Sequence, residues 1–167
     1  MIERAVFFFI LIELVVVSFG DMRTKKIPNF WAIFNIIVFI LFLFFLPHQY
    51  PLIFSMFLPS IAFLGVGFIL FLLKIMGGGD SKYLFSFFLL VPLSLHSTLF
   101  NNLLISTTII GSVFLIRNII KNFEGIYCSI RIGQFRTLKG YFGTKFPFSP
   151  VILVSWLFTG YDLRIWT

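Results

Sequence analysis

The sequence predicts an all-α fold, a polytopic bundle of about six transmembrane helices with the N-terminus outside. Three observations predict it. Of the 167 residues, 59% are hydrophobic and 11% are charged, against about 25% charged residues in soluble domains. Apolar runs of membrane-spanning length recur along the chain, and the basic residues gather between them. A soluble domain of this size has too much surface for its volume to bury so many apolar side chains, so most of the chain is expected in lipid.

The expected spans follow one another in a single transmembrane domain over residues 1–167. A bilayer core of about 30 Å requires roughly 20 apolar residues per helix. We expect spans at residues 5–19, 30–46, 52–73, 81–95, 103–116 and 146–158. The last three need their flanks to reach full length, so a bundle of about five helices is the alternative. Pro59 and Pro92 fall within spans and are expected to kink them.

The basic residues predict the orientation. Eleven of the 13 Lys and Arg residues lie in the connections after the first, third and fifth spans, and only Arg4 and Arg164 lie on the other side. Cytoplasmic loops are enriched in Lys and Arg, so these connections are expected in the cytoplasm and both termini outside. Alternatively, residues 1–20 are a secretory signal peptide. Against this alternative, cleavage of the signal peptide would leave the basic turn at residues 23–26 at the start of a translocated chain, where the positive-inside rule does not favour it.

The numbers and positions of cysteine, histidine and charged residues also exclude several kinds of functional site. The single Cys128 excludes an internal disulfide and a zinc site built on a cysteine pair. His48 and His96 fall in expected outer loops, so neither a metal site nor a serine triad is expected. The net charge of +7 is explained by topology-setting residues, and we expect no nucleic-acid partner. The basic stretch at residues 117–145 is expected to attract anionic lipid headgroups.

Two of the six acidic residues lie in unusual settings. Asp21 belongs to segment 20–29 (GDMRTKKIPN), which joins the first two spans, and Asp80 follows Gly77, Gly78 and Gly79 between the third and fourth. In ordinary terms, Asp21 is a turn residue and Asp80 is the N-cap of the fourth span. A glycine run, however, indicates positive φ or a close backbone approach. At membrane depth such backbone persists only inside protein or beside a water-filled cavity, which favours a site.

Two carboxylates in one wet cavity can hydrolyse a peptide bond. Because like charges a few ångströms apart cannot both ionise, the pair shares a proton. The ionised carboxylate activates water, and the protonated one donates to the carbonyl oxygen. The sequence does not show which of Asp21 and Asp80 is the acid and which the base.

The motifs around these aspartates resemble a known family. Residues 77–80 match the GxGD signature of intramembrane-type aspartic proteases, and Lys82 extends it to the GxGDxK form of type IV prepilin and preflagellin peptidases. Asp21, followed by Arg23 and by residues 27–29 (IPN), looks like the first aspartate motif of that family. Residues 146–150 (FPFSP) resemble the proline-containing start of its last helix.

The resemblance implies an aspartic endopeptidase that cleaves the basic leader of type IV prepilin-like precursors at the cytoplasmic face. Asp21 and Asp80 would be catalytic, and Gly77, Gly78, Gly79 and Lys82 would form the active-site loop. It implies no cofactor and no metal, a place in the cytoplasmic (inner) membrane, and prepilin or pseudopilin precursors, membrane lipid and pilus or secretion machinery as partners. The chain lacks the cysteine-rich insert of the bifunctional members, so peptidase activity without N-methyltransferase activity is expected.

Other interpretations remain open at this point. Glu13 lies mid-membrane, where an ionisable group usually faces the bundle interior; it would hydrogen-bond there or touch a polar residue of the substrate helix. A small ion- or proton-coupled transporter component using Glu13, Asp21, Asp80 and Lys82 is the alternative function, and a catalytically silent scaffold is another. Lys82, two residues after Asp80, does not face it on a helix, so it would snorkel to headgroups or position substrate.

Overall fold

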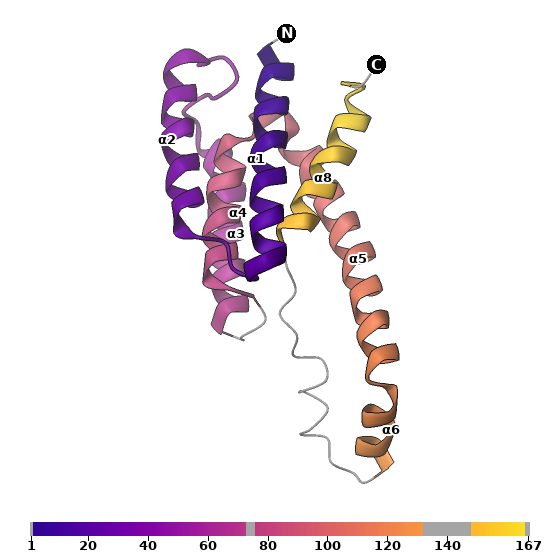
Figure 1. The fold of residues 1–167 in the computed structure, drawn as a ribbon. Coiled ribbons are helices and arrows are strands. Elements are labelled where there is room, and N and C mark those ends of the chain that lie inside the picture. The colour runs from indigo at the N-terminus through magenta and orange to yellow at the C-terminus, as the bar shows by residue number, and fades with distance from the viewer. Residues whose placement is uncertain (1, 73–75, 132–147, 166–167) are drawn as a thin grey trace.

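The computed structural model describes residues 2–72, 76–131 and 148–165. Within these ranges the chain forms helices and connecting turns with no strand, which confirms the all-α prediction (Figure 1). The elements are α1 (Ile2–Thr24), α2 (Asn29–Phe45), α3 (Phe54–Leu72), α4 (Gly78–Leu90), the 3-10 turn η1 (Leu93–Leu95), α5 (His96–Lys121), α6 (Phe123–Arg131) and α8 (Ser149–Asp162).

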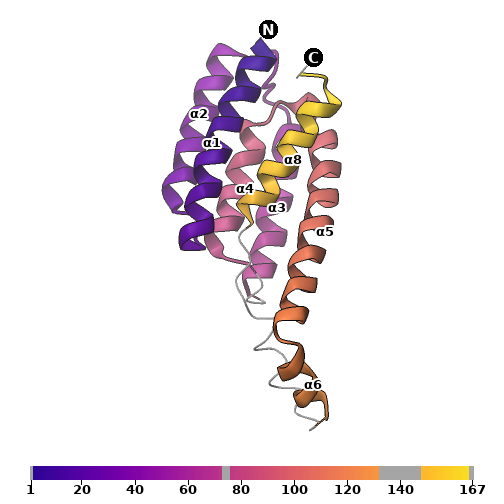
Figure 2. The ribbon, with the colours of Figure 1, turned by 45° about the vertical axis from the view of Figure 1, so that its right-hand side comes forward.

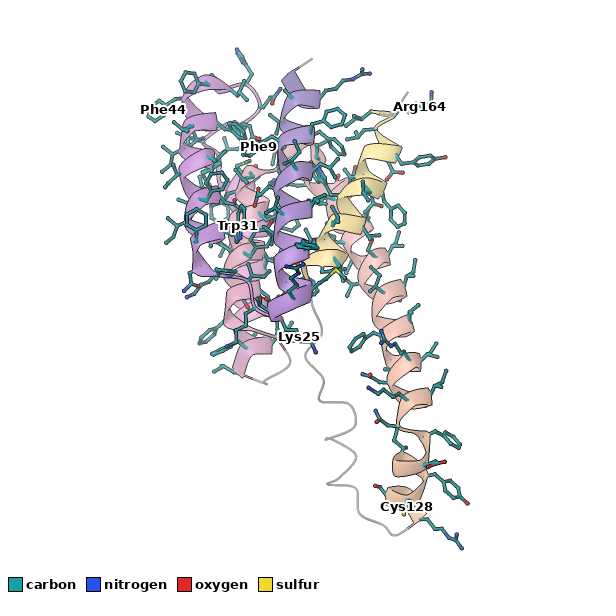
Figure 3. The ribbon with its side chains drawn as sticks, viewed as in Figure 1. Phe9, Lys25, Trp31, Phe44, Cys128 and Arg164 are labelled. Carbon is teal, nitrogen blue, oxygen red and sulfur yellow. The ribbon has the colours of Figure 1, made fainter. Side chains whose placement is uncertain are left out.

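The helices run up and down in an antiparallel bundle. Both views place the two termini at the same end (Figures 1 and 2). Lys25, just after α1, and Arg164, just after α8, lie at opposite ends (Figure 3). We call the end that contains residues 20–29 and 77–82 the site end; α8 also begins there, and α5 extends beyond it toward α6 (Figure 1).

Helix α4 is the most buried element and packs against α2 and α3. Its Phe87 ring meets Trp156 of α8 edge-on, with ring centroids 6.0 Å apart. Trp156 stacks on Phe7 of α1 at 4.8 Å, and its indole Nε1–H donates to the Phe7 carbonyl oxygen at 3.1 Å. One aromatic cluster therefore joins α1, α4 and α8.

The outer faces of the bundle are apolar. Phe44 and Phe45 of α2 are 78% and 77% exposed, and Phe44 points away from the bundle in Figure 3. Three segments of the described chain are long and apolar enough to cross a membrane: Arg4–Thr24, Phe54–Leu72 and Leu93–Lys121. Helix α2 has 17 residues and is apolar but shorter. Exposed apolar surface on helices of this length is expected in lipid, and the chain is accordingly a membrane protein.

Several helix boundaries differ from the prediction. Helix α1 continues to Thr24, beyond the expected end at residue 19, so Asp21 lies in its last turn. Helix α4 starts three residues before the expected position, at Gly78, and ends at Leu90. The predicted kink at Pro92 is wrong: the residue before a proline is pushed out of the helical region, and Val91 accordingly adopts φ −77° and ψ 129°. Pro59 does lie inside α3.

The second half of the chain differs further. Helix α5 begins at His96. His96 is buried and does not lie in an outer loop as predicted; its Nε2 lies 2.9 Å from the Val91 carbonyl oxygen. The expected polar stretch after the fifth span contains an unpredicted helix, α6. The last helix begins at Ser149, and the start expected for it at residues 146–147 lies outside the described residues.

Buried polar groups link the helices. The Tyr83 hydroxyl donates to Glu13 Oε1 at 3.0 Å, and Asn35 Nδ2 donates to Ser86 Oγ at 3.4 Å, so α1, α2 and α4 meet at one polar layer. A buried carboxyl group without a partner would be costly. Glu13, 5% exposed, therefore has the hydrogen-bonding role inside the bundle that was one of the two predicted for it.

Another buried hydrogen bond lies at the C-terminal end of α4. Tyr50, in the turn between α2 and α3, donates its hydroxyl to the Leu90 carbonyl oxygen at 2.6 Å. The last carbonyl groups of a helix have no partner within the helix, and Tyr50 supplies one. Burial raises the pKa of the Tyr50 hydroxyl, which keeps it protonated and able to donate.

The packing of α3 against α4 can be tested with two glycines of α3. A Cβ added at Gly67 would lie 2.6 Å from Ser81 Oγ and 3.2 Å from Ser81 Cα on α4, whereas a Cβ at Gly65 would meet nothing within 4 Å. We expect Gly67→Ala to lower the free energy of unfolding by about 1–3 kcal/mol, because α3 and α4 must separate. Gly65→Ala, the matched control, is expected to cause no loss. Thermal unfolding of the two variants in detergent measures this, and equal stability would contradict the packing described.

Candidate active site

Asp21 is held at the end of α1 by a defined helix stop. Lys25 adopts a left-handed conformation with φ 51°, and its N–H donates to the Asp21 carbonyl oxygen at 2.7 Å, as in a standard C-terminal cap. The Thr24 hydroxyl lies 3.0 Å from the carbonyl oxygens of Gly20 and Lys26. The chain then turns inward at Ile27, which is buried, before α2 begins. These contacts fix the backbone of the first aspartate motif.

The Asp21 side chain is 3% exposed and contacts the start of α8. Its Oδ2 accepts one hydrogen bond from the Ser149 backbone N–H at 3.2 Å and another from the Ser149 hydroxyl at 2.8 Å. The first N–H groups of a helix have no intrahelical partner, and they carry the positive end of its dipole. Asp21 therefore occupies a position at which a helix favours a carboxylate.

The sequence predicts no role for Ser149. Residues 146–150 resemble the start of a last helix and indicate nothing more. The available signal was a serine beside a proline where an apolar run begins, since serine is preferred at helix N-termini. Its partner, 128 positions earlier in the chain, could not be read from that signal.

Asp80 lies in the first turn of α4. The predicted N-cap role is wrong: Gly77 occupies the N-cap with φ −75° and ψ 145°, and Asp80 is the third residue of the helix. From there its Oδ2 accepts a hydrogen bond from the Gly77 N–H at 3.2 Å. A carboxylate at this position reaches back to the free N-cap donor, as Glu does in a capping box. Asp80 is half-buried.

The glycine run permits a close backbone approach. None of the three glycines adopts a positive φ, but a Cβ at Gly79 would collide with the Ile27 carbonyl oxygen. At Gly78 a Cβ would meet only the Phe71 ring, at 3.4 Å. Of the two reasons that the sequence offered for these glycines, the close approach is confirmed, and Gly79 is the residue that requires it.

A side-chain hydrogen bond connects the same two segments. Lys82 Nζ donates to Asn29 Oδ1, the first residue of α2, at 3.4 Å. Together with the contact between Gly79 and Ile27, it joins the segment that follows Asp21 to the segment around Asp80. Asp21, in the last turn of α1, and Asp80, in the first turn of α4, therefore both lie at the site end.

Several basic residues lie near Asp21 at the site end. The Arg23 guanidinium lies 4.3 Å from the centroid of the Phe19 ring, and Lys25 and Lys26 are exposed. Glu13 lies two turns from Asp21 along α1 and bonds to Tyr83, so it does not belong to the site end. Two carboxylates at the ends of α1 and α4, beside backbone donors, are groups suited to acid–base chemistry.

A surface groove lies elsewhere. It has a volume of about 480 Å³ on α5, and its lining residues are Val113, Ile116, Arg117, Ile120 and Lys121. None of the predicted site residues lines it. Its apolar walls and two cations suit lipid contact, not hydrolysis.

Comparison with known proteins completes these observations. Residues 8–116 match the type IV leader peptidase family, a stretch that covers more than half of the chain and includes Asp21, residues 77–80 and Lys82. No curated protein and no solved structure matches the chain. The matched stretch ends before α8, so the contact between Asp21 and Ser149 is an observation from the structure alone. By the extent of this match, the chain belongs to the type IV leader peptidase family.

Proposed function

We propose that this protein is a membrane-embedded aspartic endopeptidase that removes the basic leader from type IV prepilin-like precursors. Family membership makes it a peptidase of the leader-peptidase type; the aspartic mechanism and the substrate are the proposal. The observation that carries it is the contact of Gly79 with the Ile27 carbonyl, because it joins the segments bearing the two aspartates. Asp21 and Asp80 are the proposed catalytic pair.

The proposed reaction uses the two carboxylates in turn. The pair holds one proton between two groups. The ionised carboxylate takes a proton from water as the water oxygen attacks the scissile carbonyl carbon, and the protonated carboxyl donates to the carbonyl oxygen. Collapse of the tetrahedral intermediate breaks the C–N bond, and the amine leaves with a proton from the pair. The proposed hydrolysis needs no cofactor.

The location of the pair suits such a substrate. Arg23, Lys25, Lys26 and Lys82 belong to the site end, and the positive-inside rule places it in the cytoplasm. The bundle would then be a multi-pass protein of the cytoplasmic membrane. A prepilin-like precursor has a basic leader in the cytoplasm and a hydrophobic helix in the bilayer. A cut between them requires a site where helices end.

The neighbouring residues have supporting roles in this proposal. In the glycine run, Gly79 lets the start of α4 approach the segment that follows α1, and the Gly77 N–H donates to Asp80; Gly78 lies between them. Lys82, through Asn29, holds α2 in register with α4. Pilus or secretion machinery would be the downstream partner, since it assembles from processed precursors.

The two alternatives to a peptidase have less support. A transporter would use Glu13 as an intermediate step in an ion path, but Glu13 is engaged by Tyr83, and the matched family is one of peptidases. A silent scaffold would not require both aspartates to be held by hydrogen bonds at one end of the bundle. Each alternative predicts a different result in the experiment below.

The catalytic pair is tested by Asp21→Asn and Asp80→Asn. Both changes keep the shape of the side chain and its ability to accept a hydrogen bond, but they remove the carboxylate. Because acid–base groups typically contribute about 10²–10⁴-fold, we expect the cleavage rate to fall by at least about a hundredfold. The measurement is co-expression with a prepilin-like precursor, with the leader followed by gel shift and N-terminal sequencing.

Glu13→Gln is the control for this experiment. It alters a third buried acidic residue on α1, and glutamine still accepts the hydrogen bond from Tyr83. Cleavage close to that of wild type is expected. A dead Glu13→Gln variant that accumulates normally, with active aspartate variants, would support the ion path instead. Absence of cleavage by wild type with several precursors would favour the scaffold.

The close approach at the glycine run gives a further prediction. Gly79→Ala adds a Cβ against the Ile27 carbonyl, which is backbone and cannot rotate away, so the start of α4 must move from the end of α1. We expect cleavage to fall by about tenfold or more, because small displacements of reacting groups are costly. Gly78→Ala, whose Cβ meets a ring at 3.4 Å, is the neighbouring control and should cleave within about twofold of wild type. Equal activity of the two variants would refute the role given to Gly79.

A further inference from the structure

We propose that Ser149 is a positioning residue for Asp21, which it orients through two hydrogen bonds from the first residue of α8. This inference rests on the proposed peptidase function and assigns a role outside the stretch that matches the family, residues 8–116. Ser149 lies in the fold where α8 begins, at the site end (Figure 1).

The geometry supports an orienting role. The terminal torsion of an Asp side chain has a broad energy well, so the carboxylate needs external contacts to hold one orientation. Ser149 provides two donors, its N–H at 3.2 Å and its hydroxyl at 2.8 Å, and both end on Asp21 Oδ2. Among the residues that the structure describes, no hydrogen bond to Asp21 Oδ1 occurs.

Ser149 is itself firmly placed. It is fully buried, and α8 packs its Val151, Ile152 and Trp156 into the core. The Trp156 indole donates to the Phe7 carbonyl oxygen on α1, the same helix that carries Asp21. Because the helices that carry Ser149 and Asp21 are packed against each other, Ser149 can hold the Asp21 carboxylate within the small positional tolerance that catalysis needs.

The far end of α8 is also tied down. Asn102 of α5 donates to Thr159 Oγ1 at 3.1 Å and to Asp162 Oδ2 at 2.8 Å. Helix α8 is therefore attached to α1 and α5, and its first turn cannot slide freely. The orientation of the Asp21 carboxylate is thus set by a helix that lies far from it in sequence.

Ser149→Ala removes the hydroxyl and keeps the backbone N–H. A hydrogen bond to a charged group corresponds to a factor of about ten or more in an equilibrium or rate, so we expect kcat to fall about ten- to a hundredfold. KM should stay within about twofold, because Ser149 does not touch substrate in this assignment. The full-length chain is assayed in liposomes with a purified prepilin-like precursor, and kcat and KM are determined separately.

Ser155→Ala is the matched control. Ser155 is also fully buried on α8, but its hydroxyl bonds only to the Ile152 carbonyl oxygen on its own helix, at 2.7 Å. Ser155→Ala removes the same volume as Ser149→Ala without changing a contact to Asp21. The kcat of this control should equal that of wild type within about twofold. Ser149→Cys keeps the volume and offers only a weak donor, so it is expected to lose kcat as the alanine variant does and decides the matter if Ser149→Ala fails to accumulate.

The outcomes separate this inference from the proposed function. If wild type cleaves, Asp21→Asn is inactive, and both Ser149 variants keep the kcat of the Ser155→Ala control, the positioning role is refuted and the peptidase stands. A rise in KM with unchanged kcat would also refute it, because Ser149 would then bind substrate. If wild type cleaves no precursor, both the proposed function and this inference fall.

Discussion

The first turn of α4 lies directly against the Ile27 carbonyl because Gly79 has no side chain to hold it away. This contact is the constraint on which the site depends. The turn that carries Ile27 begins at the helix stop of α1, and Asp80 follows Gly79 by one residue. Backbone is stiffer than side chain, so a contact made through backbone positions both segments without a flexible link. Lys82 and Asn29 add a side-chain hydrogen bond at the same place.

Hydrogen bonds between buried polar groups link the helices of the bundle around this contact. Tyr83 donates to Glu13 between α4 and α1, and Tyr50 donates to the last carbonyl of α4. Trp156 does the same for a carbonyl of α1. In lipid, water cannot replace a missing partner, so each pair also specifies which helices are neighbours. The position of α8, and with it the contact of Ser149 to Asp21, follows from such pairs and from the aromatic cluster.

The sequence predicted the elements better than their ends. Within the described residues, apolar runs predicted the six longer helices, since burial in lipid or in the core needs continuous apolar surface. Their limits depend on local capping. Lys25 ends α1 after Asp21, so the helix is longer than expected. Gly77 lets α4 begin before Asp80, so Asp80 is not the N-cap that was expected. Pro92 ends a helix that it was expected to kink, and α6 has no long apolar run by which to predict it.

By itself the sequence determined the all-α membrane class and the family, because composition and short motifs are local properties of the chain. For the same reason it also indicated the two aspartates and their glycine run as candidates for the site. Only the tertiary structure decided what each residue touches. It showed that Gly79 packs on Ile27, that Lys82 reaches Asn29, that Glu13 bonds to Tyr83, and that Ser149 meets Asp21 from 128 residues away. The physical reason is that helix packing brings together side chains from distant segments, and no local pattern encodes which faces will meet.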